Sequence, residues 1–410
     1  MIKLFLIIAI SLLYVFLGTT SKGRKMYYFL TVLMLAIREL NVPFIGDITP
    51  AAVMAAILYV STIHVKSVTS RRWIPYVIYL LLSILVAYLV SPEFHRAFEW
   101  VFNLFLVMAF AVLPTKLFTH EDDSTMLSRT ILIVSFIFSL ATILAYWGFA
   151  DGTIIIASEE LGDSFQGSRV YGLAGSNLIN CVCVITFVLL PSAKIKKKWL
   201  EIAYLVIVIY AALITLKRMT TISMCMSLVY YILMQMKDRK SIKSIIVISI
   251  VVCAFAMFWE PIMQRFAIAG FGDNELEDHS TESRLLRYAY AFDIFKRFSL
   301  LGGGAGHVIF VHNGLLEILA NCGILGVVFV FFRYLPNFKD IKRLNPWAIA
   351  VIIYLTTCFM LESSINQTQI LSFLGVFLGG YYCSVKSKVD ADKHSYRKIP
   401  DDSQTNSKCV

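Results

Sequence analysis

Long apolar segments separated by short polar ones run along almost the whole chain. A helix that crosses a membrane needs about 20 apolar residues, with a range of roughly 17 to 25. About 13 segments come near this length, so the pattern predicts an all-α, polytopic integral membrane protein with roughly 12 to 14 transmembrane helices. The predicted segments are Ile2–Leu17, Met26–Leu40, Pro50–His64, Trp73–Ser91, Ala97–Leu113, Arg129–Phe149, Leu173–Pro191, Trp199–Leu216, Met219–Met236, Ser244–Trp259, Asn313–Phe332, Pro346–Leu361 and Thr368–Val385.

Lysine and arginine gather in every second loop between these segments. Examples are Lys22 to Lys25, Lys194 to Lys198 and Lys237 to Lys243. Loops rich in these residues stay on the cytoplasmic side of a membrane. We therefore expect the basic loops to face the cytoplasm, and the N-terminus and the alternate loops to face outward.

Two of the loops expected to face outward are long, 151–171 and 260–311. Long loops inside compact domains usually carry function. We predict a single transmembrane domain over residues 1–387 that holds both loops. The polar residues 388–410 are expected to form a disordered cytoplasmic tail.

Composition agrees with a membrane protein and narrows its chemistry. The 410 residues are 58% hydrophobic and 16% charged, with a formal net charge of +10. Because the cations lie in short loops between apolar segments, they indicate topology and contact with membrane lipids rather than nucleic-acid binding. Eight cysteines lie mostly in apolar segments, which favours small core residues over disulfides or a metal site.

Polar chemistry collects in the segment from Thr281 to Phe332. It begins with two cations, Arg284 and Arg287, and continues into a glycine turn. Two polar residues, His312 and Asn313, follow at the start of an apolar helix. The glycines of the turn are Gly302, Gly303, Gly304 and Gly306.

In order and spacing, this segment resembles the motif of the O-antigen polymerase and O-antigen ligase superfamily, membrane enzymes that handle lipid-linked sugar chains. The family pattern is an arginine, an aromatic residue, a G-x-G-x-G turn, H-N-x-x-L and G-I-x-G. The matching positions are Arg284, Tyr288, Gly302, Gly304, Gly306, His312, Asn313, Leu316, Gly323, Ile324 and Gly326. The resemblance implies a helical membrane enzyme.

Cations are scarce in the loops expected to face outward, so those that lie there are informative. A guanidinium group can bind two phosphate oxygens at once, which suits a lipid pyrophosphate. We predict that Arg218 and Arg284 hold this group, and that Arg169, Arg287 and Lys217 contribute to substrate binding. Arg218 also falls where the family carries an arginine after a span, although Lys217 stands where serine is commoner. Lys296 and Arg297 are expected to reach lipid headgroups instead.

His312 can act as a base near neutral pH, and we predict that it is catalytic together with Arg284 and Arg218. Asn313, Glu317 and Asn321 follow at helical spacing and form a polar stripe. We place Asn313 and Glu317 with the substrate-binding residues. Two roles remain open for Glu317: contact with an arginine or His312, or a hydrogen bond between helices.

The resemblance implies a glycosyltransferase at the outer face of the bacterial inner membrane, facing the periplasm or cell exterior. Its donor would be an undecaprenyl-pyrophosphate-linked oligosaccharide. Its acceptor would be a second lipid-linked repeat in a polymerase, or lipid A core in a ligase. We favour the polymerase, with a chain-length regulator as a further expected partner. Neither a metal nor a cofactor is expected, because arginine can supply the positive charge.

A different class of protein would also place arginines near a lipid pyrophosphate. A transporter or flippase of lipid-linked oligosaccharides is the alternative, and it predicts cations at the membrane midplane and on both faces. The sequence instead concentrates the informative cations on one face, beside a long loop.

Overall fold

The structure is a computed structural model and describes residues 2–36, 50–65, 71–91, 94–118, 123–149, 154–156, 168–170, 178–215, 218–237, 279–362 and 368–396. Helices dominate these residues, and one short antiparallel ribbon pairs β1 with β2. The elements are α1 (Ile2–Leu17), α2 (Ser21–Ala36), α3 (Pro50–Ser61), α5 (Ile74–Val90), α6 (His95–Leu117), α7 (Asp123–Tyr146), β1 (Ile154–Ile156), β2 (Ser168–Val170), α8 (Leu178–Ile185), η3 (Thr186–Leu189), α9 (Leu190–Ala193), α10 (Lys198–Ile214), α11 (Arg218–Lys237), α14 (His279–Arg297), α15 (Gly314–Phe329), η5 (Phe331–Tyr334), α16 (Phe338–Lys342), α17 (Pro346–Tyr354), η6 (Leu355–Glu362) and α18 (Thr368–Tyr396).

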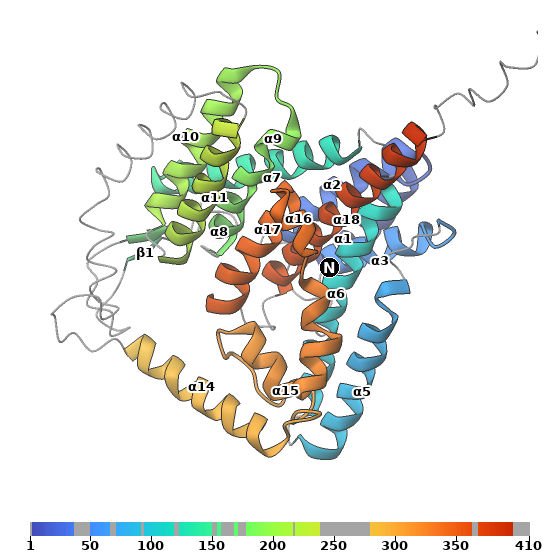
Figure 1. The fold of residues 1–410 in the computed structure, drawn as a ribbon, viewed down its shortest axis with the longest axis vertical. Coiled ribbons are helices and arrows are strands. Elements are labelled where there is room, and N and C mark those ends of the chain that lie inside the picture. The colour runs from blue at the N-terminus through green and yellow to red at the C-terminus, as the bar shows by residue number, and fades with distance from the viewer. Residues whose placement is uncertain are drawn as a thin grey trace, which may run out of the picture.

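Two helices that are far apart in the sequence, α6 and α18, form the centre of the bundle. α18 packs along α6 more extensively than any other pair among the described elements, and Figure 1 shows the two side by side. Two glycines one helical turn apart allow this approach. A β-carbon on Gly375 would lie 2.4 Å from the carbonyl oxygen of Val107, and one on Gly379 would lie 2.5 Å from the Cγ atom of Pro114. Small residues at this spacing let the backbones of membrane helices meet.

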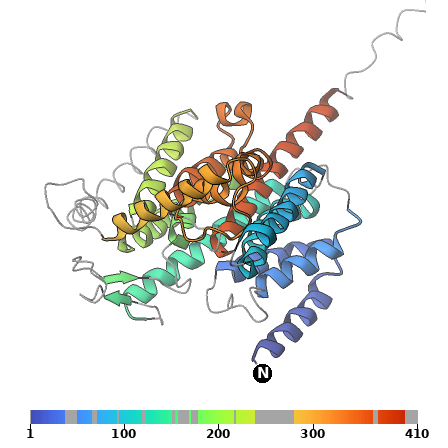
Figure 2. The ribbon, with the colours of Figure 1, turned by 90° about the horizontal axis from the view of Figure 1, so that it is seen from below.

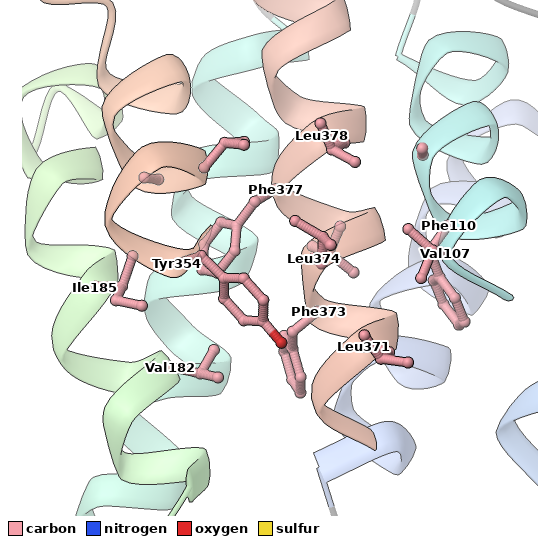
Figure 3. Close-up of a cluster of buried hydrophobic side chains, with 14 of the residues drawn as sticks. Val107, Phe110, Val182, Ile185, Tyr354, Leu371, Phe373, Leu374, Phe377 and Leu378 are labelled. Atoms are coloured by element: carbon pink, nitrogen blue, oxygen red, sulfur yellow. The ribbon is translucent and has the colours of Figure 1, made fainter. Parts of the chain in front are cut away.

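The apolar core extends outward from this helix pair. Figure 3 shows Leu371, Leu374 and Leu378 of α18 beside α6, while Tyr354 and Phe377 lie toward α8. All five side chains are buried. α7, α8, α10 and α11 pack against one another on one side of this core, and α1, α2 and α3 pack on another.

Several helices are long and apolar enough to cross a membrane. Within the described residues these are His95–Leu117, Asp123–Tyr146 and Met219–Met236, with a fourth if the pair Gly314–Phe329 and Phe331–Lys342, bent by 55°, forms one span. Shorter apolar helices accompany them, Pro50–Ser61, Ile74–Val90, Ile179–Ala193 and Pro346–Leu361. The helical, membrane-type character is therefore confirmed, whereas the predicted count of about 13 spans is not.

Most predicted apolar segments coincide with helices, and the loops between them hold the differences. The segment Ser244–Trp259 lies outside the described residues. The loop 151–171 contains the ribbon β1–β2, and the loop 260–311 contains the whole of α14. α18 continues as a helix to Tyr396, beyond residue 387 where we predicted the transmembrane domain to end.

α14 lies apart from the main bundle. Figure 1 shows it running obliquely at the lower left, and its main partner is α15. Figure 2, seen from below, shows the same helix crossing beneath the bundle. The connection from α14 to α15 carries the glycine turn, so the motif identified in the sequence lies at the end of the bundle where α5 passes into α6.

Candidate functional site

A small second core attaches α14 to the rest of the site. Ala291 and Ile294 of α14 are buried against Val308 and Val311 of the connecting loop and against Ala320 of α15. Tyr288 and Leu316 cover the edge of this cluster. This packing sets how α14 lies against α15, and so it sets where Arg284 and Arg287 lie.

The glycine turn, Gly302–Gly306, is built into the backbone of its neighbours. A β-carbon on Gly304 would lie 2.4 Å from the Cα atom of Ala87, and one on Gly302 would lie 2.3 Å from the carbonyl carbon of Asn321. Both glycines have positive φ, 92° and 75°. Neither side-chain space nor backbone conformation would admit another residue without strain.

Most N–H groups of the glycine turn donate to carbonyl groups of the protein. Gly303 N–H donates to Ala320 O at 2.9 Å, and Gly304 N–H donates to Asn321 O at 3.0 Å. Ala305 N–H donates to Ser83 O at 3.1 Å. A phosphate-binding glycine loop needs its N–H groups directed at the anion. This turn therefore acts as a scaffold that joins α15 to α5.

These bonds exist because α15 is broken at Gly323. This glycine has φ 64° and ψ −163°, which are non-helical. A break in a helix frees carbonyl groups of the preceding turn, and buried carbonyls must find other donors. Ala320 O and Asn321 O accept from the glycine turn, and Cys322 O accepts from the Tyr79 hydroxyl at 2.6 Å. The kink is thus the point to which the turn attaches.

The side chain of Asn321 adds two hydrogen bonds to this scaffold. Its Oδ1 accepts from Val308 N–H at 2.8 Å, and its Nδ2 donates to Val308 O at 2.7 Å. The side chain is completely buried. Asn321 therefore holds the loop that leads from the glycine turn to His312.

Residues Phe310 to Asn313 form a second feature, which we call the histidine loop. Phe310 and His312 both have φ 58°, in the left-handed region that residues other than glycine rarely adopt. Arg287 Nη1 donates to Phe310 O at 2.9 Å and lies 3.5 Å from His312 Nε2. Arg287 thus holds the loop in this conformation and reaches the histidine ring.

The contact with Arg287 limits how the ring of His312 can bond. A guanidinium group is only a donor. His312 Nε2 can therefore take part in this contact only as the acceptor. The lone pair of Nε2 then lies beside a fixed cation at a half-buried position.

The next polar residues of the motif make hydrogen bonds within the protein. Asn313 is its N-cap and accepts a hydrogen bond from Leu316 N–H at 2.9 Å. Glu317 is completely buried, and its Oε1 accepts from the Trp100 indole N–H of α6 at 3.0 Å. Of the two roles left open for Glu317, the structure shows the hydrogen bond between helices.

The remaining predicted residues lie on other elements. Arg284 is half-buried on α14, one turn before Arg287. Arg218 is the first residue of α11, and Arg169 pairs with Ile155 in the ribbon. The positions of the Arg218 and Arg169 side chains lie outside the described structure, as does the whole of Lys217.

Two residues next to the site were not predicted. A β-carbon on Gly306 would lie 2.7 Å from the backbone of Arg96, which places this half-buried arginine beside the glycine turn. Trp100, one turn later, donates to Glu317. The rule that picked out Arg284 could have found Arg96, because the loop between the fourth and fifth predicted segments is also expected to face outward. Nothing in the sequence marks Trp100.

No group of three histidine, cysteine, aspartate or glutamate side chains that could hold a metal occurs within the part of the chain that the structure describes. The polar groups gathered here are cations, an imidazole and a buried carboxylate. Such a set can bind an anion and accept a proton.

The fold and this site together define a helical membrane protein with a cationic site at one end of its bundle. Residues 203–331, roughly a third of the chain, match the family model described as O-antigen ligase. This match confirms the resemblance to the O-antigen polymerase and ligase superfamily and supports a function of that type. The matched stretch includes α14, the glycine turn, the histidine loop and α15. Comparisons with curated proteins and with solved structures found no match.

Proposed function

We propose that this protein is a membrane glycosyltransferase that polymerises lipid-linked oligosaccharides of an O-antigen or related surface polysaccharide. The donor is an undecaprenyl-pyrophosphate-linked glycan, and the acceptor is a second lipid-linked repeat at the outer face of the inner membrane. The observation that carries this proposal is the contact of Arg287 with His312 and Phe310, inside the stretch that matches the family.

The proposed reaction needs one bond to form and one to break. A hydroxyl oxygen of the acceptor attacks the anomeric carbon of the donor, and the bond from that carbon to the pyrophosphate oxygen breaks. The lipid pyrophosphate leaves with the bonding electrons. In this proposal the acceptor hydroxyl replaces Arg287 Nη1 at His312 Nε2, which then takes the hydroxyl proton or orients the hydroxyl so that water takes it.

A pyrophosphate leaving group requires preorganised positive charge, which stabilises the charge that develops on its oxygen. In this proposal Arg284, Arg218 and Arg169 supply that charge together with Arg287, and Lys217 adds to it. Guanidinium groups suit the role because each can donate to two phosphate oxygens. Transfer to lipid A core, as in a ligase, would use the same leaving group and the same residues, so the acceptor alone separates the two activities.

The test uses the full-length protein in liposomes with one lipid-linked oligosaccharide as the substrate, resolved on a gel. A ladder of longer glycans that disappears in His312→Ala and Arg284→Ala is the expected result. Product only after addition of lipid A core would establish the ligase instead. If folded protein gives neither product, the transferase proposal is wrong and the transport alternative should be tested with the same vesicles.

A further inference from the structure

α14 is apolar on a side that the second core does not cover. Tyr288, Ala291 and Ile294 face α15 and the loop. Leu285 is 60% exposed and Phe292 is 48% exposed, and Ala289 between them is also exposed. Positions separated by three or four residues lie on one face of a helix, so these three side chains form one stripe.

Other exposed apolar residues lie on α14 and on the connection that follows it. Leu286 is 67% exposed, and beyond the end of the helix Leu300 and Phe310 are also exposed. A protein surface in water rarely exposes an extended set of large apolar side chains. Such a set therefore marks an interaction surface.

The charges on α14 indicate what covers the stripe. Four cationic residues, Arg284, Arg287, Lys296 and Arg297, outnumber the acidic Glu282 and Asp293. Lys296 lies on the same face as the stripe, and its ammonium group lies 4.7 Å from the centre of the Phe292 ring. A lysine stem that follows apolar surface toward a charged end is typical of a helix at a membrane boundary.

We propose that α14 is an interfacial helix whose stripe, Leu285, Ala289 and Phe292, lies in the headgroup region of a bilayer containing anionic phospholipids. Its polar borders remain in water, and Lys296 and Arg297 contact the lipid phosphates. A helix with an exposed apolar side and an excess of cations binds such a surface through its buried apolar area and through attraction to anionic lipids.

This placement also gives a role to the rigid attachment of α14 to α15. If the proposed function holds, the second core carries Arg284 and Arg287 at the level of the headgroups, where the pyrophosphate of a lipid-linked donor also lies. The lipid contact itself does not depend on that function, and it can be tested without a substrate.

Site-directed spin labelling in liposomes of phosphatidylcholine and phosphatidylglycerol tests the proposal. The background carries serine at Cys225, Cys253 and Cys409, because the other five cysteines are buried. Labels are attached through Leu285→Cys and, separately, through Ser283→Cys. These exposed positions lie two residues apart and so point to nearly opposite sides of the helix. Collisions with molecular oxygen, which concentrates in lipid, are compared with collisions with a water-soluble nickel chelate.

We expect oxygen to dominate at residue 285 and nickel to dominate at residue 283. Dominance of nickel at both positions would overturn the proposal, since the stripe would then face water. A label at residue 285 that neither reagent reaches would also overturn it, because protein would then cover the stripe.

The contribution of the charges on α14 to lipid contact can be tested against a matched control in the same chain. The double variant Lys296→Glu, Arg297→Glu should lower the ratio of oxygen to nickel collisions at residue 285 several-fold in the anionic vesicles. Lys342 of α16 lies 4.8 Å from the Phe338 ring, in the same arrangement as Lys296 and Phe292. The control variant Lys339→Glu, Lys342→Glu should leave the ratio unchanged. An equal drop in both variants would contradict a specific contact of α14 with lipid.

Discussion

The glycine turn and the histidine loop are neighbours in the chain, but they are built in opposite ways. Gly304 is buried against the backbone of Ala87, and its N–H group donates to Asn321 O. His312 is half-buried, holds a left-handed conformation without being a glycine, and lies 3.5 Å from the end of the Arg287 side chain. Strain at a residue that could have been glycine is typical of a functional position.

The two halves of one motif therefore have different roles. The glycine turn joins α15 to α5 and uses the N–H groups of Gly303, Gly304 and Ala305 for bonds to protein carbonyls, so changes there should affect folding. The histidine loop presents an imidazole beside a cation, so changes there should affect the reaction and spare the fold.

The largest effect is expected from His312→Ala. Loss of a general base typically costs about 10²- to 10⁴-fold in rate. Polymerisation in liposomes, measured as glycan length on a gel, should fall by this amount while the thermal unfolding midpoint stays unchanged. His307→Gln is the matched control, because His307 lies beside Gly303 on the scaffold side. Equal loss of activity in both variants would contradict a catalytic role specific to the histidine loop.

Gly304→Ala should destabilise the protein with little direct effect on chemistry. The new methyl group would meet the backbone of Ala87, which cannot rotate away, at φ 92°. We expect a loss of about 3 kcal/mol in unfolding free energy. Gly148→Ala is the control, since Gly148 has φ 73° with nothing within 4 Å and should lose only about 1 kcal/mol. Chemical unfolding in detergent measures both, and equal losses would show that packing on α5 is unimportant.

Asn321→Ala tests the clamp between the two features. It removes both partners of the Val308 backbone groups and leaves these buried, which should cost about 2 kcal/mol of unfolding free energy. Asn337→Ala is a suitable control because Asn337 is exposed and its side chain makes no capping bond. Unfolding of the two variants in the same detergent should separate them, and the absence of a difference would contradict the clamp.

The apolar periodicity of the sequence predicted the helices well because membrane spans are long and uniformly apolar. α1 and α5 fall within one residue of their predicted bounds at each end. α14 was missed because its apolar residues are divided between two sides and mixed with charges, so its mean hydropathy resembles that of a polar loop. The ribbon β1–β2 has three residues in each strand, too few for any period to emerge.

The candidate site could be located from sequence, but its internal contacts could not. The motif and the positive-inside rule brought Arg284, Arg287 and His312 into one region. The hydrogen bond from Arg287 to Phe310 spans 23 residues and depends on how α14 rests on α15. The break at Gly323 was not predicted either, because a glycine within an apolar pattern is equally compatible with close helix packing. It is this break that supplies carbonyl groups to the glycine turn.

The smallest effect is expected at Arg287. Arg287→Ala should lower the transfer rate about 10-fold, equivalent to about 1.4 kcal/mol, because the histidine loop loses the donor that fixes Phe310 and the cation beside His312. Arg287→Lys keeps the charge but offers a compact ammonium group instead of a planar fork. If Arg287 mainly positions His312, kcat should remain low in the lysine variant with KM nearly unchanged. If it mainly binds pyrophosphate, lysine should restore most of the rate, and the loss in Arg287→Ala should appear in KM. Steady-state kinetics with a defined lipid-linked donor decide between these outcomes, and recovery of kcat by lysine would contradict the positioning role that the contact with Phe310 predicts.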